Sequence, residues 1–211
     1  MRHREGDPNM DIGKLIGNLE KRNINARFVT DAPEAVRSAL ELIHAGSRVG
    51  FGGSVTLEQT GIMDLLRDRD DVELLDRTKL DSPEALHSLY IEMFGCDVFL
   101  SSVNAVTVQG QLVSVDGRGN RVAMMAYGPR RVILIIGKNK IAEDLDAAID
   151  RVRKVACPKN VERMKKLAGS SPIAAEVEIT EERIWGQVSI IERQLDGERM
   201  HVIFVDEELG F

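Results

Sequence analysis

The sequence predicts an α/β protein whose sheet is mainly parallel and is covered by helices on both faces. Short apolar runs of strand length alternate with segments of helical periodicity along most of the chain. The most apolar run, residues 131–137, lacks polar alternation and is typical of a strand buried on both faces. Two glycine-rich breaks, at residues 51–57 and 115–121, follow predicted strands, where an α/β fold usually builds its binding site.

The first half of the chain repeats a unit of one helix and one strand. Apolar spacing predicts helices at residues 12–19, 34–44, 57–67 and 82–94, and strands at residues 25–29, 48–51, 72–75 and 97–101. Pro33 lies in the first turn of the second helix, where proline is tolerated, and Gly46 follows that helix. Strands that alternate with helices in this way predict parallel pairing.

The second half departs from this repeat. Two short runs separated by Gln109-Gly110 predict a hairpin, a strand at the centre of the sheet follows, and two further helices are expected to be separated near Cys157-Pro158. Asn120 is expected to cap a short helix that ends at Tyr127. The segments involved are residues 105–108 and 111–115 (hairpin), 131–137 (central strand), 143–156 and 160–167 (helices).

The last segments predict a closing C-terminal β-hairpin. Residues 188–193 and 200–205 both read as strands, and Asp196-Gly197 between them is a typical turn sequence. Residues 168–186 have no clear period and are expected to form a loop or lid, and residues 1–9 are expected to be flexible. We expect one domain over residues 1–211, because 43% hydrophobic content suffices for one core.

Composition and charge exclude several function classes. The formal net charge of −6 is spread without a basic block, so nucleic acid is not an expected partner. No apolar run approaches the roughly 20 residues of a membrane span, and the start lacks a signal peptide's apolar segment, which predicts a cytoplasmic protein. Cys96 and Cys157 lack the spacing of a disulfide framework, zinc site or iron–sulfur site, so no metal is expected. The apolar strands permit a homodimer.

The first glycine break predicts an anion-binding turn. Gly52 and Gly53 let the backbone turn sharply, and Thr56 with Gln59 matches the pattern of a capping box. Gly52, Gly53, Ser54 and Thr56 are expected to bind the ligand, because free amides there favour a phosphate or carboxylate. The spacing matches neither dinucleotide-binding nor nucleoside-triphosphate motifs, so no such cofactor is expected. A tight turn without a ligand is the alternative.

The second glycine break predicts a polar binding loop. Asn104, Gly117, Gly119, Asn120 and Arg121 are expected to contact a small-molecule ligand around Asp116. Asp116 is the first candidate for a catalytic base, provided that its surroundings raise its pKa, and an Asx-turn that fixes the loop is the alternative. Glu58 is the second catalytic candidate, and favourable interaction with the helix dipole is its alternative role.

Taken in order, the motifs resemble the LUD domain of the lactate-utilisation protein C (YkgG-like) family. The segments that carry the resemblance are Val49-Gly-Phe-Gly-Gly-Ser-Val-Thr-Leu57, Asp97-Val-Phe-Leu-Ser-Ser-Val-Asn-Ala105, Asp116-Gly-Arg-Gly-Asn-Arg121, Tyr127-Gly-Pro-Arg-Arg-Val-Ile133 and Gly137-Lys-Asn-Lys140. The resemblance covers residues 10–160 and resumes at residues 188–211, where Ile191-Glu-Arg-Gln194 and Glu208-Leu-Gly-Phe211 are also similar to that family.

The resemblance implies a three-layer, Rossmann-like fold of the NagB/RpiA/CoA-transferase-like group. It also implies an association with oxidation of L-lactate to pyruvate, alongside partner proteins that carry iron–sulfur clusters. Two functions stay open at this point. The first is an accessory protein of a lactate-utilisation system with a cleft for a small-molecule anion. The second is an isomerase or CoA-transferase-type enzyme, or a ligand-binding protein, acting on a phosphorylated or CoA-linked small molecule.

Overall fold

The computed structural model describes residues 12–168 and 179–211. The flexibility expected of residues 1–9 and most of the loop or lid expected at residues 168–186 lie outside these described ranges. None of the described helices is long and apolar enough to cross a membrane.

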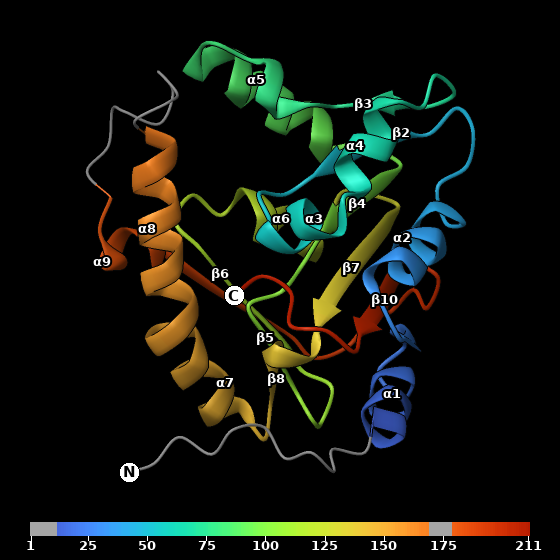
Figure 1. Cartoon of the computed structure of the whole chain (residues 1–211), viewed down its shortest axis with the longest axis vertical. Helices are drawn as coiled ribbons and strands as arrows, with labels where there is room; N and C mark the ends of the chain where they lie inside the picture. Colours follow the sequence, from blue (N-terminus) through green and yellow to red (C-terminus); the bar gives the residue numbers. More distant parts are fainter. Residues whose placement is uncertain (1–11, 169–178) are drawn as a thin grey trace.

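A six-stranded sheet in which every neighbouring pair is parallel forms the centre of the fold (Figure 1). The strands are β1 (Asn25–Val29), β2 (Arg48–Phe51), β3 (Glu73–Leu74), β4 (Val98–Ser101), β7 (Arg131–Gly137) and β10 (Met200–Val205). Their order is β1-β10-β7-β4-β2-β3, so β7 lies inside the sheet, as its apolar sequence predicts. The predicted mainly parallel α/β fold is confirmed.

Helices cover both faces of this sheet. One face carries α2 (Ala32–Leu40), α3 (Val55–Thr60) and α4 (Ile62–Arg67), and the other carries α1 (Ile12–Glu20), α5 (Pro83–Phe94) and α6 (Asn120–Ala126). Alternate side chains of β7 enter the two cores: Leu134 packs with α1 and α6, whereas Ile135 packs with α2 and α3. A strand buried in this way must be apolar at every position.

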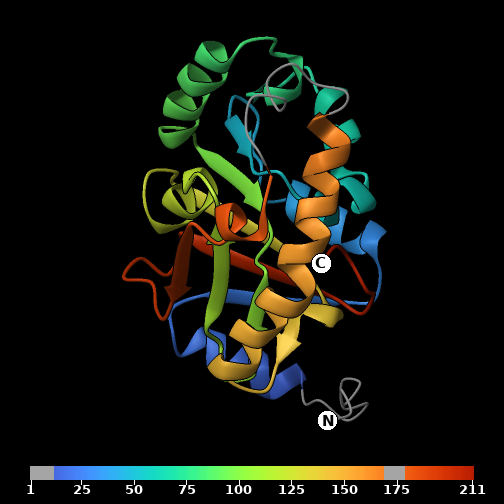
Figure 2. The same cartoon turned by 90° about the vertical axis from the view of Figure 1, so that its left-hand side faces the viewer.

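A second, smaller sheet adds to the three layers. It contains β8 (Ile141–Ala142), β5 (Ala105–Thr107), β6 (Leu112–Asp116) and β9 (Gln187–Ile191), in that order. β5 and β6 pair antiparallel, which confirms the predicted hairpin. A long outer helix packs against this sheet (Figure 2); it comprises α7 (Leu145–Arg151), a π-helical turn (Val152–Ala156) and α8 (Cys157–Ala168). The short helix α9 (Glu181–Ile184) precedes β9.

The predicted closing hairpin is wrong. β9 pairs antiparallel with β6 in the small sheet, and β10 lies between β1 and β7 in the central sheet, parallel to both. The sequences explain the separation: β10 is buried on both faces, whereas β9 is mostly exposed. A two-stranded surface hairpin would leave one apolar face of β10 in water, and the interior of the parallel sheet removes both faces from it.

Two helix boundaries also differ from the prediction. The helix expected at residues 57–67 is two helices, because Gly61 takes a left-handed conformation (φ 72°) between α3 and α4. The break expected near Cys157-Pro158 is absent, because the π-helical turn leads directly into α8. Pro158 follows this widened turn, and proline tolerates a helix position where no N–H is required.

Candidate functional site

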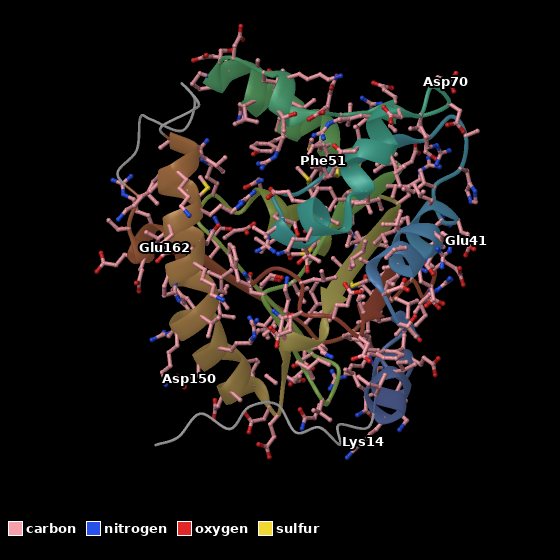
Figure 3. All side chains as sticks on the ribbon, viewed as in Figure 1. Lys14, Glu41, Phe51, Asp70, Asp150 and Glu162 are labelled. Carbon is pink, nitrogen blue, oxygen red and sulfur yellow. The ribbon has the colours of Figure 1, made fainter. Side chains whose placement is uncertain are left out.

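The carboxyl ends of β2, β4 and β7 bring residues from distant parts of the chain to one edge of the central sheet. Since β4 pairs in parallel with both β2 and β7, Gly52, Ser102 and Lys140 all follow neighbouring strands at this edge. Phe51, the last residue of β2, marks the place in Figure 3. Parallel α/β sheets bind ligands outside the carboxyl ends of their strands, which makes this edge the candidate site.

Arg121 joins the two glycine breaks. Its guanidinium donates to the carbonyl of Ser102 (2.7 Å), to Oδ1 of Asn104 (2.8 Å) and to the carbonyl of Val115 (2.9 Å). The backbone of Gly52 approaches the same side chain so closely that a Cβ there would lie 3.1 Å from Cδ of Arg121. Gly52 and Asn104, two of the predicted site residues, therefore both contact Arg121, which is itself a third.

Asp116 is the carboxylate partner of Arg121. One carboxylate oxygen lies 2.8 Å from Nη2 of Arg121, and both side chains are only 11% exposed. The other oxygen accepts the backbone N–H of Val122 at 2.9 Å, in the first turn of α6. Asp116 therefore ties the start of α6 to β6, and its role as a catalytic base stays a prediction.

The other predicted residues of this loop have structural reasons for their identity. Gly119, not Asn120, occupies the cap position of α6, with φ 83° and no side-chain cap. A Cβ on Gly117 would meet the backbone carbonyl of Arg183, and one on Gly119 would meet the side chain of Gln187. These glycines thus let the loop lie against the segment that leads into β9.

A pocket of about 230 Å³ opens beside the first glycine break. Its wall includes Gly52, Gly53, Ser54, Glu58, Arg67 and Arg77. Gly53 leaves room for Arg77, whose Nη2 lies 2.6 Å from the place that a Cβ would occupy. Arg77 donates to the hydroxyl of Tyr90 (3.3 Å), and its buried Nε has no partner among the described residues.

Arg77 also lacks a carboxylate partner within residues 12–168 and 179–211. Arg67 in the same wall is paired with both Asp64 and Asp76, each at 2.9 Å. Glu58 points to the outer helix, where its carboxylate lies 2.6 Å from Arg163. Arg77 is therefore the guanidinium of this pocket that is available to an anion.

The predicted capping box is not formed. Ser54 caps α3 by accepting the N–H of Leu57, whereas Thr56 is fully buried and donates to the carbonyl of Leu209. Gln59 accepts the N–H of Gly210 instead of reaching back along its own helix. Both residues thus hold the segment that follows β10 against the carboxyl edge of the sheet.

Lys140 lies under that segment and, like Arg77, is a functional candidate that sequence reasoning missed. Its side chain is 2% exposed, and Nζ donates to Oγ1 of Thr56 (2.8 Å) and to Oγ of Ser102 (2.9 Å). Arg151, also largely buried, donates to the carbonyls of Asn139 (2.9 Å) and Asn104 (2.6 Å). A lysine in the short turn that follows the central parallel strand was the available signal, because ligands bind there.

Burial, together with the charges of Arg151 and Arg121, holds the pKa of Lys140 well below its ordinary value. Between the lowered pKa and the ordinary one, the unfolded chain binds a proton that the folded protein lacks, so stability rises with pH. We expect the free energy of unfolding, measured in urea between about pH 6 and 10, to rise less with pH in Lys140→Met than in the wild-type protein. Lys138→Met, at an exposed lysine, should keep the wild-type slope, and equal slopes for all three proteins would contradict the prediction.

No three described His, Cys, Asp or Glu side chains gather as a metal site requires. The site is instead a basic, hydroxyl-rich edge of a parallel sheet, next to a glycine-lined pocket. These features define an α/β domain whose candidate site combines residues from both sheets.

The chain belongs to the LUD domain family, whose model matches residues 12–205, and this family is associated with lactate utilisation. No curated protein matches the sequence. The chain is similar in structure to a DUF162 family protein from Deinococcus radiodurans, with a TM-score of 0.50 and 14% identity over 92% of this chain and 95% of that one. This likeness supports the fold alone.

More distant likenesses cover about half of the chain. A D-ribose-5-phosphate isomerase solved with phospho-erythronic acid aligns with a TM-score of 0.35 and 17% identity, over 54% of each chain. The beta subunit of eIF2B from Chaetomium thermophilum aligns with a TM-score of 0.38 and 16% identity, over 55% of this chain and 44% of that one.

Proposed function

We propose that this chain is an accessory protein of a lactate-utilisation system and binds a small carboxylate, such as lactate or pyruvate, in the pocket beside Gly53. The proposal rests on family membership and on one observation above all: Arg77 lines the pocket without a carboxylate partner among the described residues. A guanidinium binds a carboxylate through two parallel hydrogen bonds, which suits this ligand class. In this proposal the chain works in the cytoplasm with iron–sulfur partner proteins.

Binding can be measured by thermal shift and calorimetry with lactate, pyruvate, sugar phosphates, nucleotides and acyl-CoAs. A ligand at 100 times its Kd should add about 2.7 kcal/mol to the free energy of unfolding. Arg77→Gln is expected to abolish the gain obtained with lactate, whereas Arg37→Gln, on the exposed side of α2, should keep it. A gain with lactate that survives in Arg77→Gln would exclude this pocket as the site.

The accessory role has a separate test. Co-purification with the iron–sulfur proteins of the same lactate-oxidising system should yield a specific complex, and the chain alone should show no turnover. Absence of every such partner from the purified material would count against the role.

The second candidate is an isomerase or CoA-transferase-type enzyme. Lys140 favours it, because a buried amine with a lowered pKa is a common catalytic group. Turnover of a sugar phosphate or an acyl-CoA by the isolated chain would support this candidate over the accessory role.

A further inference from the structure

The amine of Lys140 is buried without an anionic partner among the described residues. Its two hydrogen-bond partners are hydroxyl groups, and the charged groups that affect its pKa, Arg151 and Arg121, are both cations. A structural lysine at 2% exposure would be expected to pair with a carboxylate, because an unpaired buried charge is costly.

The hydrogen bonds fit a neutral amine. The hydroxyl of Thr56 donates to the carbonyl of Leu209, and that of Ser102 points to the carbonyl of Val103, so both hydroxyl oxygens accept from Nζ. A neutral amine has two N–H donors, which match these two acceptors and leave its lone pair unused, whereas an ammonium would have a third donor without a partner. An amine with a free lone pair is a nucleophile.

Arg151 supplies a second recognition group. Its Nε and Nη1 bind backbone carbonyls, and no ion pair to its guanidinium occurs in the described part of the chain. The bond from Nε ends on Asn139, the neighbour of Lys140, and the charge of Arg151 acts on the Lys140 amine. A nucleophilic amine beside a guanidinium suits a molecule that carries a carbonyl next to a carboxylate.

We propose that Lys140 captures a 2-oxo acid as a reversible imine, with the acid's carboxylate on Arg151. The lone pair of Nζ attacks the carbonyl carbon, and the carbonyl oxygen gains a proton. That proton comes from nitrogen. The second nitrogen proton then converts the hydroxyl into water, which leaves as the C–O bond breaks, and the electron pair on nitrogen forms the C=N bond. Ser102 and Thr56 lie within hydrogen-bond distance of Nζ and can pass these protons. One water is released, and no oxidant or reductant is needed.

The segment after β10 controls access to this amine. It crosses the carboxyl edge of the sheet in Figure 1 and is held by side-chain bonds, from Asn139 and Thr56 among others, instead of a strand ladder. Gly210 has φ 64°, and a Cβ there would meet Thr56 and lie 3.1 Å from Nζ of Lys140. Gly210→Ala should therefore loosen the segment and expose the amine.

The imine can be trapped in the intact protein. Incubation with pyruvate and sodium borohydride should convert it to a stable secondary amine, which adds the mass of pyruvic acid less one oxygen atom. Peptide mapping of the wild-type protein should place the adduct on Lys140, and lactate, which has a hydroxyl in place of the ketone group, should give none. Gly210→Ala should be labelled faster than wild type, and an unchanged rate would overturn the proposed access route.

Two lysines of the same 3₁₀ turn provide matched variants. Lys140→Arg should lose the adduct, and Lys138→Arg, at an exposed lysine paired with Asp206, should keep it. Absence of an adduct in wild type, or labelling of surface lysines that persists in Lys140→Arg, would overturn the proposal. Arg77→Gln should still be labelled, because imine formation at Lys140 does not use Arg77. The labelling experiment therefore tests the imine separately from carboxylate binding in the pocket beside Gly53.

Discussion

Replacing Asp116 by alanine is expected to lower the free energy of unfolding by about 3–5 kcal/mol, as removal of one partner of a buried ion pair does. The substitution leaves the guanidinium of Arg121 without its carboxylate at 11% exposure. It also removes the acceptor of the Val122 N–H at the start of α6. Both losses act on the connection between the small sheet and α6.

Urea unfolding of the Asp116→Ala variant measures this effect directly. Asp150→Ala is the control, because it removes a carboxylate from an exposed ion pair with Lys154 on the outer helix (Figure 3) and should cost about 0.5 kcal/mol or less. An Asp116→Ala protein as stable as wild type would show that the carboxylate does not stabilise the fold. That result would favour a catalytic role for Asp116.

Replacing Phe204 by alanine is expected to cost about 3–5 kcal/mol, the usual range for a buried aromatic side chain. Phe204 is 1% exposed on β10 and packs in the core beneath α1 and α6. Its strand has neighbours on both sides, β1 and β7, so the surrounding side chains have little freedom to close the cavity.

The position of β10 makes this substitution a test of the topology. In a surface hairpin Phe204 would be partly exposed, and its replacement by alanine would lower the free energy of unfolding much less. Leu195→Ala, at a side chain that is 99% exposed, should leave stability within about 0.5 kcal/mol of wild type. If both variants lost similarly little stability in urea or thermal unfolding, that result would contradict the central placement of β10.

Local signals predicted most elements of the fold. The strands at residues 25–29 and 48–51 match β1 and β2, and the helix opened by Ser82 is capped by that residue. Strand partners were harder to predict, because pairing depends on residues far apart in sequence. Asp196-Gly197 has the local chemistry of a turn, yet the burial needs of β10 decided where that strand lies.

Only part of the candidate site was predicted, because the rest of it also depends on residues far apart in sequence. Glycine marks a turn by its own backbone freedom, so both breaks were visible in the sequence. Arg77 and Lys140 stand among other polar residues in short 3₁₀ turns and resemble surface residues there. Their interest comes from burial and from the absence of a carboxylate partner among the described residues, properties that only the folded arrangement creates.

The place of β10 between β1 and β7 also constrains the order of folding during synthesis. Asn25 has His201 as its register partner, so β1 has no strand beside it until residues 200–205 have left the ribosome. Until then β7, which is apolar from Val132 onward, presents an unpaired edge, and such an edge is a template for wrong pairing. The nascent chain thus carries this unpaired edge from the completion of β7 until β10 emerges, and we expect its yield in cells to depend on chaperones that cover the edge during that interval.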